Sequence, residues 1–268
     1  MRQVEELRDA VEAYLESLTF APELGALEPV LRYSLESKGK RIRPVLCLAV
    51  VEAAGGDVEH GLPAAAALEL VHTFSLVHDD LPALDDDAER RGRPSAHVAF
   101  GEGVALLAGD ALLGEALRLA LTYDDPGIAR ELVDATLGMI GGQYLDITGG
   151  GDDLARLHRL KTGRLLAASV GLGLRAADLP EAEWAPWRAF GEELGLLFQV
   201  VDDILDADGF AAKVGVEGAR ELADDAADRA LGRLAALRAD TSVLRELVDY
   251  LAVRIGLGVD SALLLSTI

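Results

Sequence analysis

The chain has 268 residues, of which half are hydrophobic but only 5% aromatic, and its formal net charge at pH 7 is -21. Such an acidic chain repels phosphate backbones, which excludes general nucleic-acid binding. Its single cysteine, Cys47, excludes an intramolecular disulfide and a thiolate metal site, and favours a reducing, cytoplasmic location. No apolar run reaches the ~18 residues of a membrane span, and residues 1–16 lack the apolar core of a signal peptide.

Apolar residues recur at spacings of three and four through most of the chain, which predicts helices rather than strands. We find neither a repeat of fixed period nor a long polar linker, so residues 1–268 are expected to form one all-α domain. Glycine and proline divide the chain into segments of ordinary helix length at 55–56, 62–63, 91–94, 125–127, 149–151 and 179–180.

The first concentration of basic residues is 37–44, Ser-Lys-Gly-Lys-Arg-Ile-Arg-Pro, which places four cations around a glycine just before a predicted helix. The free N–H groups of a helix N-terminus also favour an anion, so this segment would suit a diphosphate. A run of surface charge is the alternative. Lysine is scarce, so its placement is informative: the chain has only Lys38, Lys40, Lys161 and Lys213.

The first acidic cluster lies at the end of an apolar helical run that starts at Ala64. Negative charge at a helix C-terminus is opposed by the helix dipole, so the cluster is costly unless cations bind it. Oxygen ligands alone favour Mg²⁺, which takes few carboxylates and leaves positions for phosphate. The basic segment 90–94 follows directly. Five carboxylates fall within nine positions: Asp79, Asp80, Asp85, Asp86 and Asp87.

Glycines interrupt apolar helical segments in the second half of the chain, each at a cost of about 1 kcal/mol. Either close helix packing or a cavity lined by small residues would explain them. The segment 161–164, Lys-Thr-Gly-Arg, opens a further apolar helix. The glycines are Gly138, Gly141, Gly142, Gly171, Gly173, Gly191 and Gly195.

The second acidic cluster, 202–206, also follows an apolar helical run. Asp202 and Asp206 are four residues apart and share a helix face that can hold one ion, whereas Asp203 turns sideways. A solvated acidic face would explain either cluster alone. The presence of both, each at the end of an apolar helix, favours a metal site between two facing clusters.

The segments 39–44, 79–85, 90–94, 141–143, 161–163 and 202–206, in this order, resemble the short-chain trans-polyprenyl diphosphate synthases, the family of farnesyl and geranylgeranyl diphosphate synthases. The resemblance spans residues 39–206. It implies the isoprenoid synthase helical bundle around a central substrate cavity, usually as a homodimer. It also implies a prenyltransferase that condenses isopentenyl diphosphate with dimethylallyl or geranyl diphosphate, releases diphosphate, and uses three Mg²⁺ ions when substrate is bound.

The resemblance implies roles for individual residues. Isopentenyl diphosphate would be bound by Lys40, Arg43, His72 and Arg91, although His72 by pattern alone fits an ordinary core histidine. The allylic diphosphate would be bound by Arg90, Lys161, Thr162 and Gln199. Mg²⁺ would be held by Asp79, Asp85 and Asp202, with support from Asp80, Asp203 and Asp206. The expected catalytic residues are Asp79, Asp80, Asp85, Asp202, Asp203 and Lys161.

Two residues are expected to set the product length. Phe74 and Ser75 precede Asp79 by five and four positions, so they lie about one turn deeper along the helix beside the growing chain. An aromatic residue at the fifth position, with a first motif lengthened by two residues, resembles a farnesyl (C15) producer. If Phe74 is ordinary core packing, geranylgeranyl diphosphate (C20) is the alternative product.

The sequence departs from this family after the second cluster. A glycine-lysine element and a loop with another aspartate and a diphosphate-binding lysine are expected, but residues 208–215 run directly into 216–220. Either the protein lacks the loop, which would put catalysis in doubt, or residues are missing from the sequence near Gly215 and Val216. Family-like text on both sides favours the second explanation.

Two other functions share part of this pattern. A terpene cyclase usually carries an Asn/Ser/Glu metal motif where this chain has its second aspartate cluster, and needs no isopentenyl diphosphate site. A non-catalytic partner subunit usually loses one aspartate motif, whereas this chain has both, and only the absent loop favours that function.

Overall fold

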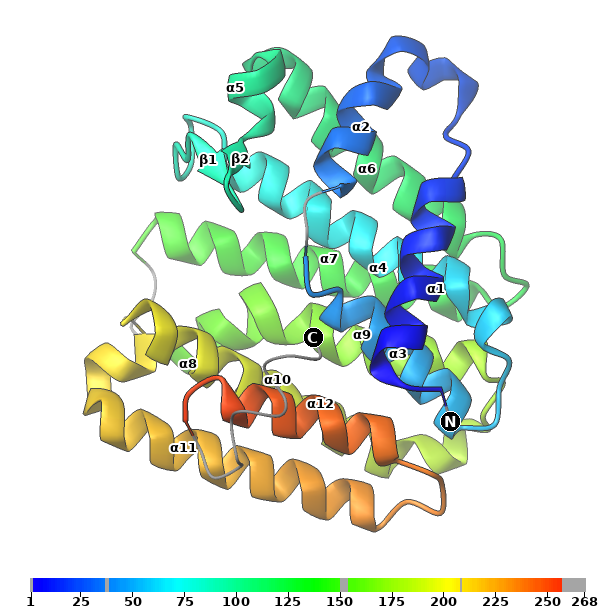
Figure 1. Ribbon diagram of the computed structural model, residues 1–268, viewed down its shortest axis with the longest axis vertical. Coiled ribbons are helices and arrows are strands. Elements are labelled where there is room, and N and C mark those ends of the chain that lie inside the picture. The colour runs from blue at the N-terminus through cyan, green and yellow to red at the C-terminus, as the bar shows by residue number, and fades with distance from the viewer. Residues whose placement is uncertain (1, 37–38, 150–153, 208, 257–268) are drawn as a thin grey trace.

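The structure, a computed structural model, describes residues 2–36, 39–149, 154–207 and 209–256, and it is helical almost throughout (Figure 1). The prediction of an all-α fold is confirmed. Among the described residues the only strands are β1 and β2, which pair as a small antiparallel hairpin. In chain order the elements are α1 (Val4–Ser17), η1 (Pro22–Leu27), α2 (Glu28–Leu35), α3 (Ile42–Ala53), α4 (Val58–Asp79), β1 (Glu89–Arg90), β2 (Arg93–Pro94), α5 (Ala96–Phe100), α6 (Glu102–Ala120), α7 (Pro126–Ile147), α8 (Leu154–His158), η2 (Arg159–Gly163), α9 (Arg164–Ala176), η3 (Glu181–Glu183), α10 (Trp184–Asp206), α11 (Gly209–Ala235) and α12 (Ser242–Val253).

The core is built around α3, α4 and α9. Every residue from 45 to 51 and from 64 to 71 is buried, because α4 packs against α3, α6 and α9 at once. Small residues permit these close approaches: a Cβ at Gly173 of α9 would lie 2.7 Å from the backbone oxygen of Cys47 in α3. Close helix packing is therefore the explanation for Gly173. On the other side α10 packs against α9 and α11, and α11 against α12 (Figure 1).

The predicted break at 62–63 is wrong, because α4 continues through Pro63. Proline has no N–H, and its ring displaces the carbonyl four residues before it. The hydroxyl of Tyr123, between α6 and α7, repairs the disturbed turn: it accepts a hydrogen bond from the N–H of Ala64 at 3.1 Å and donates one to the carbonyl of His60 at 2.5 Å. A long-range contact thus keeps α4 continuous, and sequence periodicity contains no information about it.

The predicted breaks at 55–56 and 125–127 are confirmed. The side chain of Asp57 accepts a hydrogen bond from the backbone N–H of Glu59 and starts α4, and that of Asp125 does the same with Gly127 at the start of α7. A side-chain oxygen at this position satisfies an N–H group that has no partner within the helix. The break at 149–151 lies partly outside the described residues.

The chain is continuous where the resemblance predicts an additional loop. Gly215 lies within α11 and takes φ 79° and ψ 160°, so the helix kinks there, and Val216 follows directly. The described residues therefore contain no counterpart of the expected aspartate and lysine. The second aspartate cluster leads almost directly into α11, with only residues 207 and 208 between the helices.

Candidate active site

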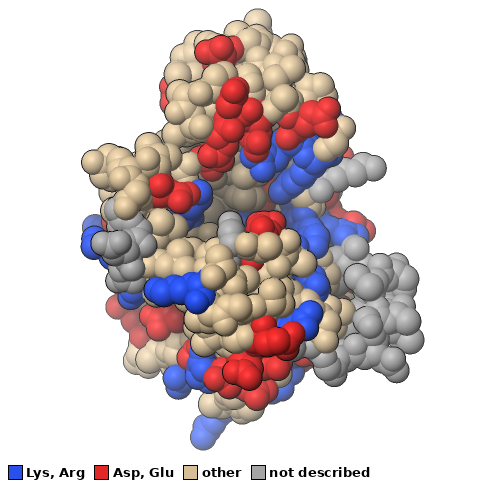
Figure 2. All heavy atoms as spheres, turned by 90° about the vertical axis from the view of Figure 1, so that its left-hand side faces the viewer, with Lys and Arg blue, Asp and Glu red and all other residues tan. Residues whose placement is uncertain are grey.

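The two aspartate clusters lie at the C-terminal ends of two helices that reach the same side of the molecule. The first follows α4 and the second forms the last turn of α10. Both ends lie at the left in Figure 1, and Figure 2 views this side directly: Lys and Arg side chains surround a hollow, and Asp and Glu side chains gather above it. Acidic and basic side chains therefore gather around the hollow on this side of the molecule.

One cavity at this mouth is mostly apolar. It has a volume of about 370 Å³ and lies between α4 and α7, with Asp79 and Lys161 among the polar residues that line it. Phe74 and Ser75 of α4, the residues predicted to set product length, both line this cavity, and Phe74 is 6% exposed. Side chains of α7 form the opposite wall: Met139, Ile140, Gln143, Tyr144 and Ile147.

The neighbouring cavity is cationic. It has a volume of about 300 Å³ and shares Arg43, His72 and Thr162 with the apolar cavity, so the two adjoin. Lys40 and Arg91, both predicted ligands of isopentenyl diphosphate, line it, as does Asp202. The structure therefore brings all four residues predicted for this substrate to one cavity.

Burial shapes the charges of this cationic cavity. It lowers the pKa of Arg43, partly offset by the carboxylates of Glu69 and Asp202. Burial, together with Arg43, Arg91 and other arginines, lowers the pKa of His72 well below its usual range, so its imidazole is neutral. Cations that are buried without full counter-charge favour an anion, and a diphosphate would supply it.

The first aspartate cluster divides into two groups with different surroundings. Burial, with the nearby carboxylates of Asp85 and Asp80, raises the pKa of Asp79 to about 6, although Lys161 opposes the shift. Asp80 is 3% exposed and accepts a hydrogen bond from Nε of Arg90 at 2.8 Å. Arg90 also pairs with Asp87 at 2.9 Å. Asp79 thus faces the cavity, whereas Asp80 and Arg90 bind each other outside it.

The second cluster divides in the same way. Asp202 lies 3.3 Å from Nη1 of Arg254, and burial raises its pKa against the effect of that arginine. Asp203, 2% exposed, accepts hydrogen bonds from the Gln199 amide at 2.6 Å and the Phe210 N–H at 2.7 Å. Asp206 is exposed. The sideways orientation predicted for Asp203 is confirmed, and it directs this carboxylate toward α11.

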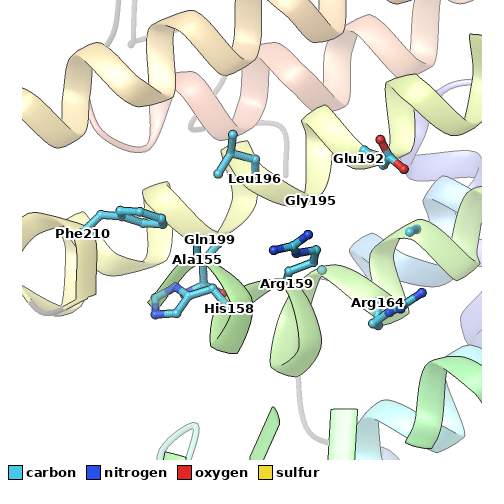
Figure 3. A pocket seen from close by; sticks show the side chains of 11 residues that line it. Ala155, His158, Arg159, Arg164, Glu192, Gly195, Leu196, Gln199 and Phe210 are labelled. Carbon is cyan, nitrogen blue, oxygen red and sulfur yellow. The ribbon is translucent and has the colours of Figure 1, made fainter. Parts of the chain in front are cut away.

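Gln199 was predicted to bind the allylic diphosphate, but it lines neither the apolar nor the cationic cavity. It lines a third cavity, of about 500 Å³, which lies between α8, α9 and α10 and is shown in Figure 3, where Gln199 and His158 lie close together and Phe210 lies at one side. Arg90 likewise lines only a small cavity beside Asp80 and Ser95. For Gln199 and Arg90 a role as ligands of the allylic diphosphate stays a prediction.

The donor set fits a hard cation only with help from a ligand. Among the described residues no three carboxylate, histidine or cysteine groups are close enough to hold a metal ion by themselves. The available donors at the mouth are carboxylate oxygens, which suit Mg²⁺, and this ion commonly takes one or two carboxylates together with substrate phosphates. The residues therefore fit Mg²⁺ bound jointly with a diphosphate.

Two residues that line the cationic cavity, Arg254 and Glu69, were not predicted from the sequence. Arg254 follows α12, far from any motif, and no local pattern distinguishes it from a surface arginine. Glu69 lines the cationic cavity although nothing in its sequence context marks it. Lys161, a predicted ligand, forms an ion pair with Asp146 of α7 at 2.5 Å.

These features, a helical bundle with adjoining cationic and apolar cavities below two aspartate clusters, define a prenyltransferase of the isoprenoid synthase fold. The sequence pattern of the polyprenyl synthetase family matches residues 25–233, and the chain belongs to this family. None of the described helices is both long and apolar enough to cross a membrane.

Relatives of known function and solved structures agree with this assignment. A geranylgeranyl diphosphate synthase of Cyanophora paradoxa is 42% identical over 207 residues, covering 72% of this chain and 69% of the relative. A farnesyl diphosphate synthase of Micrococcus luteus is 34% identical over 280 residues, covering 92% of this chain and 96% of the relative. The structure of a geranyltransferase from Legionella pneumophila superposes with a TM-score of 0.84 at 32% identity, covering 94% of this chain and 96% of that one.

The length of one alignment bears on the missing loop. The match to the Micrococcus luteus enzyme extends over 280 positions, more than the 268 residues of this chain, so the relative carries residues inside the aligned region that this chain lacks. Both explanations given for the absent loop predict this difference in length.

Proposed function

We propose that the protein condenses isopentenyl diphosphate with dimethylallyl or geranyl diphosphate in a Mg²⁺-dependent reaction that releases diphosphate. The observation that carries the proposal is the pair of adjoining cavities. The cationic cavity suits the diphosphate of isopentenyl diphosphate, and the apolar cavity suits an allylic chain with its diphosphate at Asp79 and Lys161. Arg43, His72 and Thr162 line both, so two substrates bound there would meet at their reactive ends.

The residues of the chain have distinct tasks in this reaction. Lys161 and Thr162 hold the allylic diphosphate as its bond to carbon breaks, and Lys40, Arg43 and Arg91 orient isopentenyl diphosphate so that its double bond attacks the allylic carbon. A proton then leaves the new chain for the released diphosphate. Three Mg²⁺ ions, held by Asp79, Asp85 and Asp202 with support from Asp203 and Asp206, would neutralise charge on the leaving group.

Farnesyl diphosphate is the proposed product. Phe74 lines the apolar cavity and its ring packs edge-on against His78, with 5.1 Å between the ring centres, so α4 presents a bulky wall one turn from Asp79. Ser75 adds little volume there because its side chain is small, and its hydroxyl donates a hydrogen bond to the carbonyl of His72 at 2.8 Å. Geranylgeranyl diphosphate remains the alternative, since relatives of both kinds match the chain.

We further propose a cytoplasmic homodimer. Large apolar side chains are exposed in a stripe along α7, and neighbouring ones are exposed on α6, including Leu107, which is 57% exposed. A patch of this kind is typical of an interface between copies. The stripe on α7 consists of Val133, Leu137, Ile140, Tyr144 and Ile147.

The function is tested by incubating the purified protein and Mg²⁺ with labelled isopentenyl diphosphate and, separately, dimethylallyl, geranyl and farnesyl diphosphate. Chromatography of the dephosphorylated products identifies their length. A C15 product from the first two primers supports the proposal. Binding of isopentenyl diphosphate without turnover of any primer would instead identify a non-catalytic partner subunit, the function that the absent loop favours.

A further inference from the structure

The arginine in the middle of the basic segment, Arg41, differs from its neighbours Lys40 and Arg43. By sequence it is one of four clustered cations, but in the structure its side chain is only 2% exposed. Nε donates to Glu12 at 2.8 Å, Nη1 to Glu69 at 2.5 Å, and Nη2 to the Leu35 carbonyl at 2.5 Å. Arg41 lines the cationic cavity as its neighbours do, but each of its three guanidinium nitrogens is bound to an acceptor within the protein.

The acceptors of Arg41 come from three different helices. Glu12 belongs to α1, Leu35 ends α2, and Glu69 lies in α4, one turn before His72. Arg41 itself immediately precedes α3. One guanidinium thus joins the four helix segments around the basic segment, which carries Lys40 and Arg43 to the cationic cavity.

The backbone of Arg41 is also unusual. It has φ 50° and ψ 32°, in the left-handed region that residues with side chains adopt only when their surroundings hold them there. This turn sets the directions in which Lys40 and Arg43 leave the chain. The three contacts of its side chain anchor Arg41 in this turn and so help to hold it.

Glu69 explains why the buried group at position 41 is a cation. It is 2% exposed, lines the cationic cavity, and acts electrostatically on Arg43 and Arg91. A carboxylate left unpaired there would attract those arginines and compete with a diphosphate. The short contact to Arg41, which lines the same cavity, neutralises Glu69.

We propose that Arg41 is a positioning residue for the isopentenyl diphosphate site: it fixes the turn that presents Lys40 and Arg43, and it neutralises Glu69 so that this carboxylate does not compete with a diphosphate. The inference rests on the proposed function. It assigns to Arg41 an effect on one substrate only, since Lys161, which in the proposed function holds the allylic diphosphate, does not line the cationic cavity.

The chain offers a matched control. Arg32 also fastens helices together, with hydrogen bonds to the carbonyls of Leu15 and Glu16 and an ion pair with Glu28 at 3.0 Å, but it lines neither the cationic nor the apolar cavity. Arg32→Met therefore reports the effect of loosening α1 and α2 without a change near the substrates. Arg41→Met removes a similar number of contacts at the cavity.

The test measures binding of isopentenyl diphosphate alone by titration calorimetry, so that no turnover occurs, and the KM of the allylic substrate in separate assays. Arg41→Met should raise the Kd for isopentenyl diphosphate roughly tenfold or more, and Arg32→Met should leave it within about twofold of wild type. The allylic KM should change less than about twofold in both. Adding Glu69→Gln to Arg41→Met should restore part of the binding, because it removes the unpaired carboxylate.

Arg41→Lys keeps the charge and loses the fork of donors, so it serves if Arg41→Met does not fold; a smaller rise in the same Kd is expected. If a folded Arg41 variant binds isopentenyl diphosphate with the Kd of the wild type, the inference about Arg41 is overturned but the proposed function is not. Equal loss of binding in Arg32→Met, or equal rises for both substrates, also overturns it, since either indicates general loosening. A wild-type protein that binds no isopentenyl diphosphate overturns the proposed function, and the inference with it.

Discussion

The guanidinium of Arg254 lies 3.3 Å from the carboxylate of Asp202, so the residue that follows α12 contacts the second aspartate cluster. This arginine supplies positive charge beside the partly buried carboxylate. A bound metal ion would supply charge of the same sign, as the prediction that Asp202 is a metal ligand requires.

Replacing Asp202 or Asp79 by Ala should therefore lower kcat by roughly 10² or more, because each change removes charge stabilisation from the departing diphosphate. Steady-state kinetics with saturating substrates measures the effect. Asp228→Asn, an exposed carboxylate change on α11, is the control and should leave kcat unaltered. Near-normal rates in either alanine variant would refute the assignment of these residues.

Removal of the metal should abolish activity. Among the residues that the structure describes, the carboxylates at the cavity mouth have too few neighbouring donors to hold an ion tightly by themselves, so a chelator should extract it readily. Activity measured in excess EDTA should vanish and return when Mg²⁺ is added in excess of the chelator. Full turnover in EDTA would contradict a metal-dependent mechanism.

The affinity for Mg²⁺ should depend on pH through Asp79. Its pKa is raised to about 6, and only the ionised carboxylate binds the ion, so affinity should fall as pH drops through 6 and level off above about 7. Titration of the Mg²⁺ dependence of the rate between pH 5 and 8 would show this. A profile for Asp79→Asn that falls at the same pH as wild type would assign the titration to another group.

Phe74→Ala should lengthen the product. Removing the ring opens the apolar cavity beside α4, so at least one more five-carbon unit should be added and the main product should shift from C15 toward C20. Ser75→Ala is the control, because it removes a hydroxyl at the neighbouring position and opens almost no space. If wild type already makes mainly C20, or the product of Phe74→Ala is unchanged, deeper residues set the length.

A charge placed on α7 should separate the proposed dimer. Leu137 is 61% exposed in the apolar stripe and does not line the substrate cavity, so Leu137→Glu should yield a monomer by light scattering after size-exclusion chromatography. Leu121→Glu alters a similarly exposed leucine, 69% exposed, just after α6, and should remain dimeric. A wild-type protein that is monomeric in the same measurement would contradict the proposed homodimer.

The sequence was a good guide to the helices and to the chemistry that lies close together along the chain. Apolar periodicity predicted that α4 and α10 end at the aspartate clusters, and the spacing of Asp202 and Asp203 predicted their different directions. The helix break predicted at Pro63 was wrong because the residue that compensates for the missing N–H of proline, Tyr123, is 60 residues away in sequence.

The other features of the site that could not be predicted depend on contacts between residues far apart in sequence. Arg41 and Arg43 are indistinguishable as charges in a basic segment, and only burial against Glu12 and Glu69 separates their roles. Arg254 reaches the cationic cavity from the other end of the chain without any motif. The pairing of Asp80 with Arg90 depends on how the hairpin of β1 and β2 folds back onto α4.

The hydroxyl of Tyr123 between His60 and Ala64 links two positions that would otherwise vary independently. With Pro63 in place, loss of that hydroxyl removes a hydrogen bond from both the His60 carbonyl and the Ala64 N–H, whereas an alanine at position 63 would restore an ordinary helical turn and make the hydroxyl dispensable. Among homologous sequences, proline at this position should therefore occur together with tyrosine at 123, and phenylalanine at 123 should be found where position 63 is not proline.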